Sequence, residues 1–136
     1  ALPMMRKAKW GRIINISSAH GLVASPQKAA YVAAKHGVIG LSKVAALETA
    51  EEPITVNAIC PGFTETPLLE KQLPNLMKQY SMTEKELVNN VLMQRQPSKK
   101  FVTSEQISGL VQFLCSKDAD QVTGSAISID GGWTAM

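Results

Sequence analysis

Three short runs of apolar residues, many of them β-branched, are separated by longer stretches with a helical pattern. The runs span Arg12–Ile16, Thr55–Ile59 and Ala126–Ile129. Short and almost continuously apolar runs are typical of strands that are buried on both faces. Strands that alternate with helices form parallel βαβ units. The sequence therefore predicts an α/β layer fold with about three parallel strands and flanking helices.

The stretch between the first two runs is rich in alanine and predicts a helix from Lys28 or Ala29 to about Glu48. Gly37 and Gly40 lie inside this helix, and each costs about 1 kcal/mol relative to alanine. We therefore expect another segment to approach the helix backbone closely at these two positions.

The segment from about Pro67 to Arg95 is polar, rich in methionine and helical in two pieces, and Pro74 should interrupt the first piece. Two capping-box spacings predict the starts of later helices: Thr83 with Glu86, and Thr103 with Gln106. An apolar stripe at helical spacing follows the second of these starts. Ahead of this segment, Cys60-Pro61-Gly62 should end the second strand.

The length and charge of the chain suit one modest domain, with 136 residues and a net charge of +3. The basic residues form no stripe and no basic helix, so we expect no nucleic-acid partner. One short basic cluster is interpreted as a solvated helix end: Arg6, Lys7, Lys9 and Arg12. The first seven residues carry no strand or cap signal, and they are interpreted as the tail of an element that begins elsewhere.

The two cysteines lie far apart and lack the spacing of a metal site. Cys60 and Cys115 are interpreted as small buried residues of a cytosolic protein, without a disulfide. No apolar run approaches the length of a membrane span, and no signal peptide opens the chain. We therefore expect a cytoplasmic protein with no bound metal and no membrane partner.

Tyr31 and Lys35 lie four residues apart on the predicted helix, so both side chains project from one face. A phenol titrates at about pH 10 and is a poor acid–base catalyst at neutral pH. An ammonium group beside it favours the phenolate and makes proton transfer easier. Ser18 follows the first strand, at the edge where open α/β sheets bind ligands. The Tyr–Lys spacing also occurs often by chance, so the spacing alone assigns no function.

Four motifs occur in order along the chain: Asn15–Ser18, Tyr31–Lys35, Asn57–Gly62 and Asp130–Gly132. Together they resemble the C-terminal half of the short-chain dehydrogenase/reductase family, over essentially the whole chain. The resemblance implies the C-terminal half of a doubly wound Rossmann-type sheet, and it implies Ser18, Tyr31 and Lys35 as catalytic residues. In such enzymes Tyr31 would take the hydroxyl proton and Ser18 would position the reacting oxygen. Lys35 would activate Tyr31 and also bind the nicotinamide ribose.

Finer features resemble one branch of that family, the 3-hydroxybutyrate dehydrogenases. These features are Ser17–Pro26, Lys28, Lys35–Gly37, Gln72 and Gly131–Ala135. The branch implies hydride transfer between 3-hydroxybutyrate and NAD, which gives acetoacetate. It also implies four substrate-binding residues: His20, Lys28, Gln72 and Trp133.

A small carboxylate needs charge-assisted donors to offset its desolvation, and the basic residues of that set suit this need. Each assignment has a plainer alternative. Lys28 can be a surface charge, Gln72 a solvated helix residue and Trp133 an anchor in the core.

The loop after the second strand resembles the family loop that meets the nicotinamide end of NAD. The matching cofactor-binding residues are Pro61, Gly62, Phe63, Thr64 and Thr66, and the resemblance adds Tyr31 and Lys35 to this cofactor-binding set. Glu65 departs from the apolar residue that the family pattern leads us to expect. The segment 67–98 is interpreted either as a substrate lid or as an ordinary pair of surface helices.

The family's glycine-rich phosphate loop has no counterpart in this sequence, so the resemblance implies an incomplete NAD site. The choice between NAD and NADP stays open. The first strand would have an unpaired edge, so we expect a homo-oligomer or pairing with a complementary half-domain. Two alternatives to this function are a truncated, non-catalytic remnant or interaction module, and another short-chain reductase of a small keto acid or sugar.

Overall fold

Three parallel strands form the centre of the computed structural model, which describes residues 1–136 apart from the side chain of Leu68. The strands are β1 (Gly11–Ile16), β2 (Ile54–Pro61) and β3 (Ala126–Ile129). They lie in the spatial order β1-β2-β3. The predicted parallel α/β fold is confirmed.

The central strand β2 is buried along its whole length. β1 pairs with it from Gly11 opposite Ile54, and β3 pairs with its second half from Ala126 opposite Ala58. Because successive side chains of a strand point to opposite faces, β2 contributes to the core on both sides of the sheet. All three strands run the same way, so their carboxyl ends meet at one edge.

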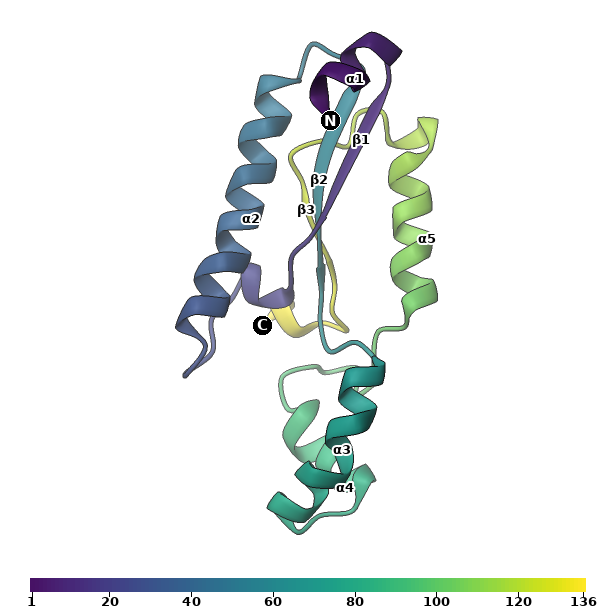
Figure 1. The fold of residues 1–136 in the computed structure, drawn as a ribbon. Coiled ribbons are helices and arrows are strands. Elements are labelled where there is room, and N and C mark those ends of the chain that lie inside the picture. The colour runs from purple at the N-terminus through teal and green to yellow at the C-terminus, as the bar shows by residue number, and fades with distance from the viewer.

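Two helices cover opposite faces of the sheet, as Figure 1 shows: α2 (Ala29–Glu48) and α5 (Ser104–Cys115). On one face, Ile39 and Ala46 of α2 pack against alternate residues of β2: Ile54, Val56, Ala58 and Cys60. On the other face, Ile59 packs with Leu114 of α5 and with Ala119. The predicted bounds of α2 and the predicted capping box before α5 are confirmed.

A short first helix, α1 (Leu2–Ala8), precedes β1 and packs Leu2 and Met5 against the α2 side of the core. Its Arg6 forms an ion pair with Glu52, with Nε 2.9 Å from the carboxylate, which ties the helix to the turn before β2. Arg6 and Lys7 lie in the last turn of α1. The predicted solvated helix end is therefore confirmed for these residues.

The interpretation of Arg12 as part of that solvated cluster is wrong. Arg12 belongs to β1, its side chain is 5% exposed, and its guanidinium pairs with Asp120. The strand carries this side chain under the turn that follows α5, and the Asp120 carboxylate offsets part of the cost of burying its charge. A charge pattern along the chain cannot indicate an ion-pair partner more than one hundred residues away.

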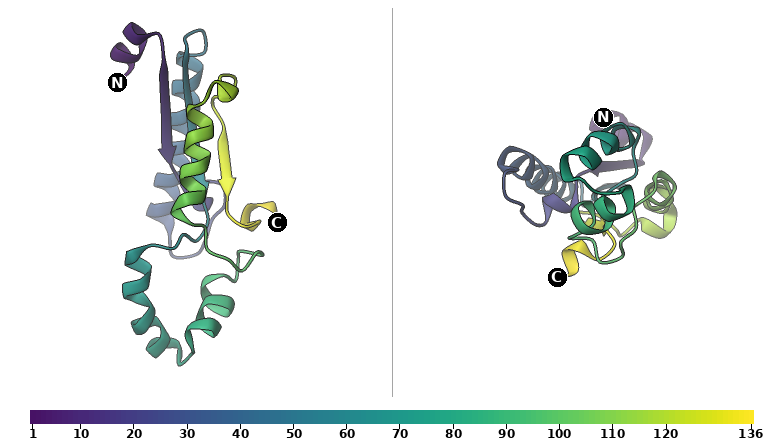
Figure 2. Two further views of the ribbon diagram at one scale, coloured as in Figure 1. Left: turned by 90° about the vertical axis from the view of Figure 1, so that its right-hand side faces the viewer. Right: turned by 90° about the horizontal axis from the view of Figure 1, so that it is seen from below.

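Two further helices extend beyond the carboxyl ends of the strands, away from the sheet (Figures 1 and 2). They are α3 (Pro67–Tyr80) and α4 (Glu84–Leu87), and a π-helical turn at Val88–Leu92 follows α4. The capping box at Thr83 is confirmed. The predicted interruption at Pro74 is wrong, because α3 continues through it. Pro74 and Glu70 are exposed, so water can bind the Glu70 carbonyl that loses its amide donor.

The second strand extends further than predicted, to Pro61 rather than Ile59. The pairing of β2 with β3 continues through Cys60 and Pro61, and a proline is tolerated at a strand end where no amide donor is needed.

Both cysteines are free. The predicted burial is confirmed for Cys60 and is wrong for Cys115, which ends α5 and is exposed.

The outer face of α2 carries glycines and large apolar side chains. A Cβ added at Gly37 or Gly40 would meet no atom within 4 Å, so the predicted close approach is not made by the part of the chain that the structure describes. Leu41, Val44 and Leu47 on this helix are 64%, 53% and 78% exposed. Among the described strands, β1 pairs with β2 alone, so its outer edge is open.

We propose that the 136-residue chain associates through the open β1 edge and the apolar face of α2, because unpaired edges and exposed apolar patches favour pairing with another chain. Size-exclusion chromatography with light scattering should give a mass above that of the monomer at micromolar concentration. Leu41→Glu and Leu47→Glu should lower this mass, whereas Tyr80→Glu, at an exposed position on α3, should not. A wild-type chain that is monomeric throughout would contradict this.

Candidate active site

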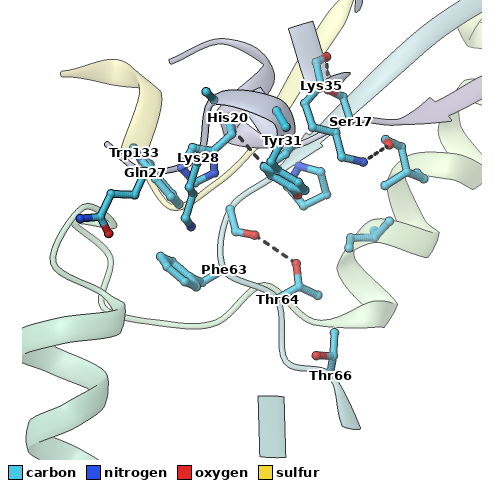
Figure 3. Close-up of a pocket in the computed structure, with 17 residues that line it drawn as sticks. Ser17, His20, Gln27, Lys28, Tyr31, Lys35, Phe63, Thr64, Thr66 and Trp133 are labelled. Atoms are coloured by element: carbon cyan, nitrogen blue, oxygen red, sulfur yellow. Dashed lines mark hydrogen bonds between the residues drawn. The ribbon is translucent and has the colours of Figure 1, made fainter. Parts of the chain in front are cut away.

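A cavity of about 840 Å³ opens at the carboxyl ends of the strands. Its walls come from the segments after β1 and β2, from the first turns of α2 and from Trp133 after β3. Figure 3 shows Lys28, Tyr31 and Phe63 arranged around this common space. Parallel sheets of this kind bind ligands at this edge. Every predicted site residue lines the cavity except Gln72.

Tyr31 and Lys35 lie one turn apart on α2 and both line the cavity. Lys35 Nζ lies 5.7 Å from the centre of the Tyr31 ring and donates a hydrogen bond of 3.1 Å to the carbonyl of Ile16. This bond holds the ammonium group at the end of β1. Tyr31 is 47% exposed, so a ligand in the cavity can reach it. A phenol beside a fixed ammonium group is an arrangement suited to proton transfer.

The two serines after β1 have different contacts. Ser17 Oγ donates to the carbonyl of Lys35 at 2.9 Å, which ties the loop to α2. Ser18 Oγ accepts a hydrogen bond of 3.2 Å from the backbone N–H of His20 and caps the short 3₁₀ turn Ala19–Gly21. In this contact Ser18 is an acceptor, so its own proton is free for an oxygen atom in the cavity.

Gly21 allows this turn to lie directly on α2. A Cβ at this position would lie 2.9 Å from the Lys35 carbonyl and 2.7 Å from Cδ1 of Ile39. Both distances are below normal contact, so a larger residue would push the turn away from the helix. The glycine therefore brings His20 close to the Tyr31 side of the cavity.

His20 is almost fully buried, with 5% of its surface exposed, and it contacts two aromatic rings edge-on. The ring centres lie 5.8 Å from Tyr31 and 4.9 Å from Trp133. Burial lowers the pKa of His20, and the nearby charges of Lys28 and Arg95 lower it further. The ring is therefore in an environment that favours its neutral form.

Trp133 is both an anchor in the core and part of the cavity wall, and its role in substrate binding stays a prediction. It is buried, stacks on Phe63 with ring centres 5.2 Å apart, and also lines the cavity. The turn that carries it is held by Asp130, whose carboxylate accepts hydrogen bonds from the backbone N–H groups of Gly132 and Thr134 at 3.0 Å and 2.9 Å. Trp133 is thus an anchored wall of the cavity.

The loop after β2 is fixed by backbone hydrogen bonds to Val102. The Val102 amide donates to the carbonyl of Phe63 at 2.9 Å, and the Glu65 amide donates to the carbonyl of Val102 at 3.1 Å. In such a parallel bridge the N–H and C=O of the residue between, Thr64, point away from the partner strand. Thr66 caps α3, because its hydroxyl accepts from the Leu69 amide at 3.3 Å.

Glu65 is exposed and does not line the cavity, so its departure from the family pattern puts no negative charge there.

Gln96 supports the loop after β2. It is fully buried, and its side chain accepts from the Phe63 amide at 2.9 Å and donates to the carbonyl of Lys100. Sequence reasoning missed this residue, because no local pattern links Gln96 to a loop thirty-three residues earlier.

Gln72 is exposed on α3 and lies outside the cavity. The residues that line the cavity include none from the segment 67–98 in the part of the chain that the structure describes. A role of Gln72 in substrate binding would therefore need α3 to move toward the strands. The role of this segment as a lid stays a prediction.

The cavity has a positive character. The charged side chains that line it are Lys28 and Lys35, and the described lining contains no carboxylate. Over residues 1–136, side chains of histidine, cysteine, aspartate and glutamate form no group of three that could hold a metal ion. Across the same residues, every helix is too short or too polar to cross a membrane. The arrangement suits a small anionic ligand beside an acid–base pair.

Comparison with known proteins agrees with this arrangement. A family model described as enoyl-(acyl carrier protein) reductase matches residues 1–134. The chain belongs to the short-chain dehydrogenase/reductase family. Two relatives within this family are D-beta-hydroxybutyrate dehydrogenases. The protein of Rhizobium meliloti (strain 1021) is 57% identical over 136 residues, and that of Cupriavidus necator (strain ATCC 17699) is 49% identical over 136 residues.

The alignment covers 100% of this chain and 53% of each of these two relatives, so the chain spans about half their length. Solved structures of the family show the same fold. For a variant of actinorhodin polyketide ketoreductase with NADPH, the match covers 97% of this chain and 50% of the ketoreductase chain, with a TM-score of 0.85 and 32% identity. For 4-hydroxyisoleucine dehydrogenase complexed with NADH, the match covers 98% of this chain and 51% of the dehydrogenase chain, with a TM-score of 0.82 and 36% identity.

The lowered pKa of His20 predicts how stability depends on pH. An unfolded chain takes up a proton on histidine below about pH 6.5, whereas folded His20 resists protonation until a lower pH. His20 therefore contributes stability above about pH 6.5 that is lost as the pH falls toward its folded-state pKa. Urea unfolding followed across this window should show the loss.

His20→Gln should reduce this pH dependence, and His36→Gln, which replaces the exposed histidine on α2, should keep it. If His20→Gln lost as much stability as the wild type when the pH fell, burial of His20 would not be the cause.

Proposed function

We propose that this chain is the catalytic half of an oxidoreductase that transfers a hydride between 3-hydroxybutyrate and NAD, giving acetoacetate. One observation carries the proposal: side chains of complementary chemistry converge on the same cavity, namely Ser18, His20, Lys28, Tyr31 and Lys35. The two D-beta-hydroxybutyrate dehydrogenase relatives support the choice of substrate. Because the chain spans about half of those relatives, the activity of the whole protein is itself part of the proposal.

In the proposed mechanism Tyr31 takes the proton of the substrate hydroxyl. The carbon that carries this hydroxyl gives up its hydrogen as a hydride, and its C–O bond becomes C=O. Lys35, held on the Ile16 carbonyl, stabilises the phenolate that accepts the proton. Ser18 donates its free proton to the reacting oxygen and so fixes its position. When bound, NAD supplies the acceptor for the hydride.

His20 and Lys28 are proposed to bind the substrate carboxylate. Lys28 precedes the first turn of α2 and brings a positive charge to the cavity, and His20 brings a ring N–H. Charge-assisted hydrogen bonds of this kind offset the desolvation of a small anion. Trp133 and its stacked partner Phe63 form the apolar wall on the same side and limit the size of the substrate.

The loop after β2 suits the carboxamide of a nicotinamide. The N–H and C=O of Thr64 point away from Val102 while Thr64 lines the cavity, and a carboxamide needs one donor and one acceptor. Pro61, Gly62, Phe63 and Thr66 would complete this part of the site, and Lys35 would meet the ribose. The NADPH and NADH complexes of solved relatives support a nicotinamide cofactor, and the preference for NAD rests on the resemblance to the 3-hydroxybutyrate branch.

We propose that residues 1–136 act as one partial domain in which the segment 67–98 is a lid. Closure of α3 over the cavity would bring Gln72 to the substrate. We also propose that the protein works in the cytoplasm as a homo-oligomer or with a complementary half-domain. Two free cysteines suit a reducing compartment, and the open β1 edge suits association with another chain.

Two other functions are each favoured by one observation. A non-catalytic remnant or interaction module is favoured by the open sheet edge in a chain that spans about half of its relatives. Another short-chain reductase of a small keto acid or sugar is favoured by the likeness to sorbitol-6-phosphate 2-dehydrogenase of Erwinia amylovora, with a TM-score of 0.85 and 30% identity. The next two experiments separate these alternatives.

Tyr31→Phe removes the proton acceptor and keeps the ring. We expect kcat for the oxidation of 3-hydroxybutyrate to fall roughly 10²- to 10⁴-fold, with the thermal unfolding midpoint nearly unchanged because Tyr31 is half exposed. Tyr80→Phe, the same substitution at the other tyrosine, should leave kcat unchanged. Absence of NAD-linked activity in the wild type would favour the non-catalytic module.

Lys28→Ala tests the substrate. Loss of a charged donor to the carboxylate should raise KM for 3-hydroxybutyrate roughly tenfold, with a smaller change in kcat. KM for a secondary alcohol of similar size without a carboxylate should not rise. Lys78→Ala on α3 provides a matched control for the loss of an exposed lysine. Equal effects on both substrates would favour the sugar alternative.

A further inference from the structure

A chain of hydrogen bonds connects the cavity residue His20 to Arg95, at the far end of the segment 67–98. His20 Nε2 lies 2.7 Å from Ser25 Oγ. The same hydroxyl lies 2.9 Å from Nη1 of Arg95, which also donates to the carbonyl of Ala24 at 3.0 Å. Ala24 and Ser25 thus lie between His20 and Arg95 in space, and between His20 and Lys28 in sequence.

The chemistry of the groups fixes the direction of the Arg95 bond and favours one direction for the His20 bond. A guanidinium has donors and no acceptor, so Arg95 donates and Ser25 Oγ accepts. The Ser25 hydroxyl has one proton, and accepting a bond from a cation makes this proton a better donor. Donation of this proton to an unprotonated His20 Nε2 is therefore favoured over acceptance of a proton from the ring. The ring proton of His20 then lies on Nδ1.

Nδ1 is the donor that His20 can offer to a ligand. The ring is buried and lines the cavity, and in the described chain Nε2 rather than Nδ1 makes the side-chain hydrogen bond. Other groups that titrate or carry charge lie around the ring. Lys28 and Tyr31 lie at the start of α2, and Arg95 is connected to the ring through Ser25. Burial together with the positive charges of Lys28 and Arg95 lowers the pKa of His20.

Arg95 is well placed for this contact because its neighbour is rigid. Gln96 is fully buried and bound to the Phe63 amide and to the carbonyl of Lys100. The backbone at Arg95 is therefore anchored to the loop after β2, although the Arg95 side chain itself is exposed. Its two hydrogen bonds fix the segment that carries both His20 and Lys28 against this anchored loop.

We propose that Ser25 and Arg95 are positioning residues, which hold His20 as a neutral Nδ1–H donor aimed at the substrate carboxylate. The part of this proposal that concerns the carboxylate rests on the proposed function. The part that concerns the state of His20 stands on the contacts of Ser25 and Arg95, and it can be measured without any activity.

The test uses the full protein, labelled with ¹⁵N-histidine and observed by NMR. In the wild type, His20 should give a protonated Nδ1 and an unprotonated Nε2 at neutral pH. Ser25→Ala and Arg95→Gln should move the proton toward Nε2 or mix the two tautomers, and Ser25→Thr should restore the wild-type spectrum. The signals of His36 should not move, and Gln94→Ala, next to Arg95 and also exposed, should change nothing.

Kinetics add a second measurement. Ser25→Ala and Arg95→Gln should raise KM for 3-hydroxybutyrate roughly five- to tenfold, because one donor to the carboxylate is lost or misdirected. Since His20 binds the substrate and takes no part in proton transfer, kcat should change by less than about twofold. A merely structural role would lower the thermal unfolding midpoint without moving the proton on His20.

A wild-type His20 that carries its proton on Nε2 would overturn the proposal, whatever the activity. So would His20 signals that stay unchanged in both Ser25→Ala and Arg95→Gln. The expected NMR changes in a protein without activity on hydroxy acids would support the tautomer assignment and contradict the proposed function. Failure of the tautomer assignment and failure of the proposed function are thereby distinguishable.

Discussion

The site depends on how α2 is held against β1. Three hydrogen bonds link them in a row: Asn15 Nδ2 to Ser42 Oγ at 2.9 Å, Ser17 Oγ to the Lys35 carbonyl at 2.9 Å, and Lys35 Nζ to the last carbonyl of β1 at 3.1 Å. Each contributes a net stabilisation of roughly 0.5–1.5 kcal/mol. Together they fix the rotation of the helix about its axis. This rotation decides that Tyr31 faces the cavity.

The sequence predicted those features that local chemistry determines. The capping box at Thr103 and the spacing of Tyr31 and Lys35 need no knowledge of the rest of the chain, and the structure has them where they were expected. Contacts between distant segments could not be predicted in this way. Gln96 contacts the loop after β2 because the chain returns to the sheet after α4. Arg12 can be buried because it forms an ion pair with Asp120, which follows α5.

Buried polar groups support loops at both ends of the sheet. Gln96 serves the loop after β2, and Asn57 serves the turn before β3, where its amide donates to the carbonyl of Val122 at 2.6 Å and its oxygen accepts from the Ser125 amide at 3.1 Å. Both are fully buried, so removal of either would leave unpaired backbone groups at a cost of about 1–3 kcal/mol. Gln96 therefore contributes both to stability and to the shape of the cavity, whereas Asn57 contributes to stability.

The open edge of the sheet and the acid–base pair are connected through one residue. Ile16 ends β1, is 50% exposed, and supplies the carbonyl that holds the Lys35 ammonium group. The outer edge of β1 is free among the described strands, and an edge strand moves more readily than a strand that is paired on both sides. A strand added to this edge would restrict β1 and with it the Ile16 carbonyl. A strand paired with β1 would therefore steady the position of Lys35 beside Tyr31, although no residue of that strand would need to enter the cavity.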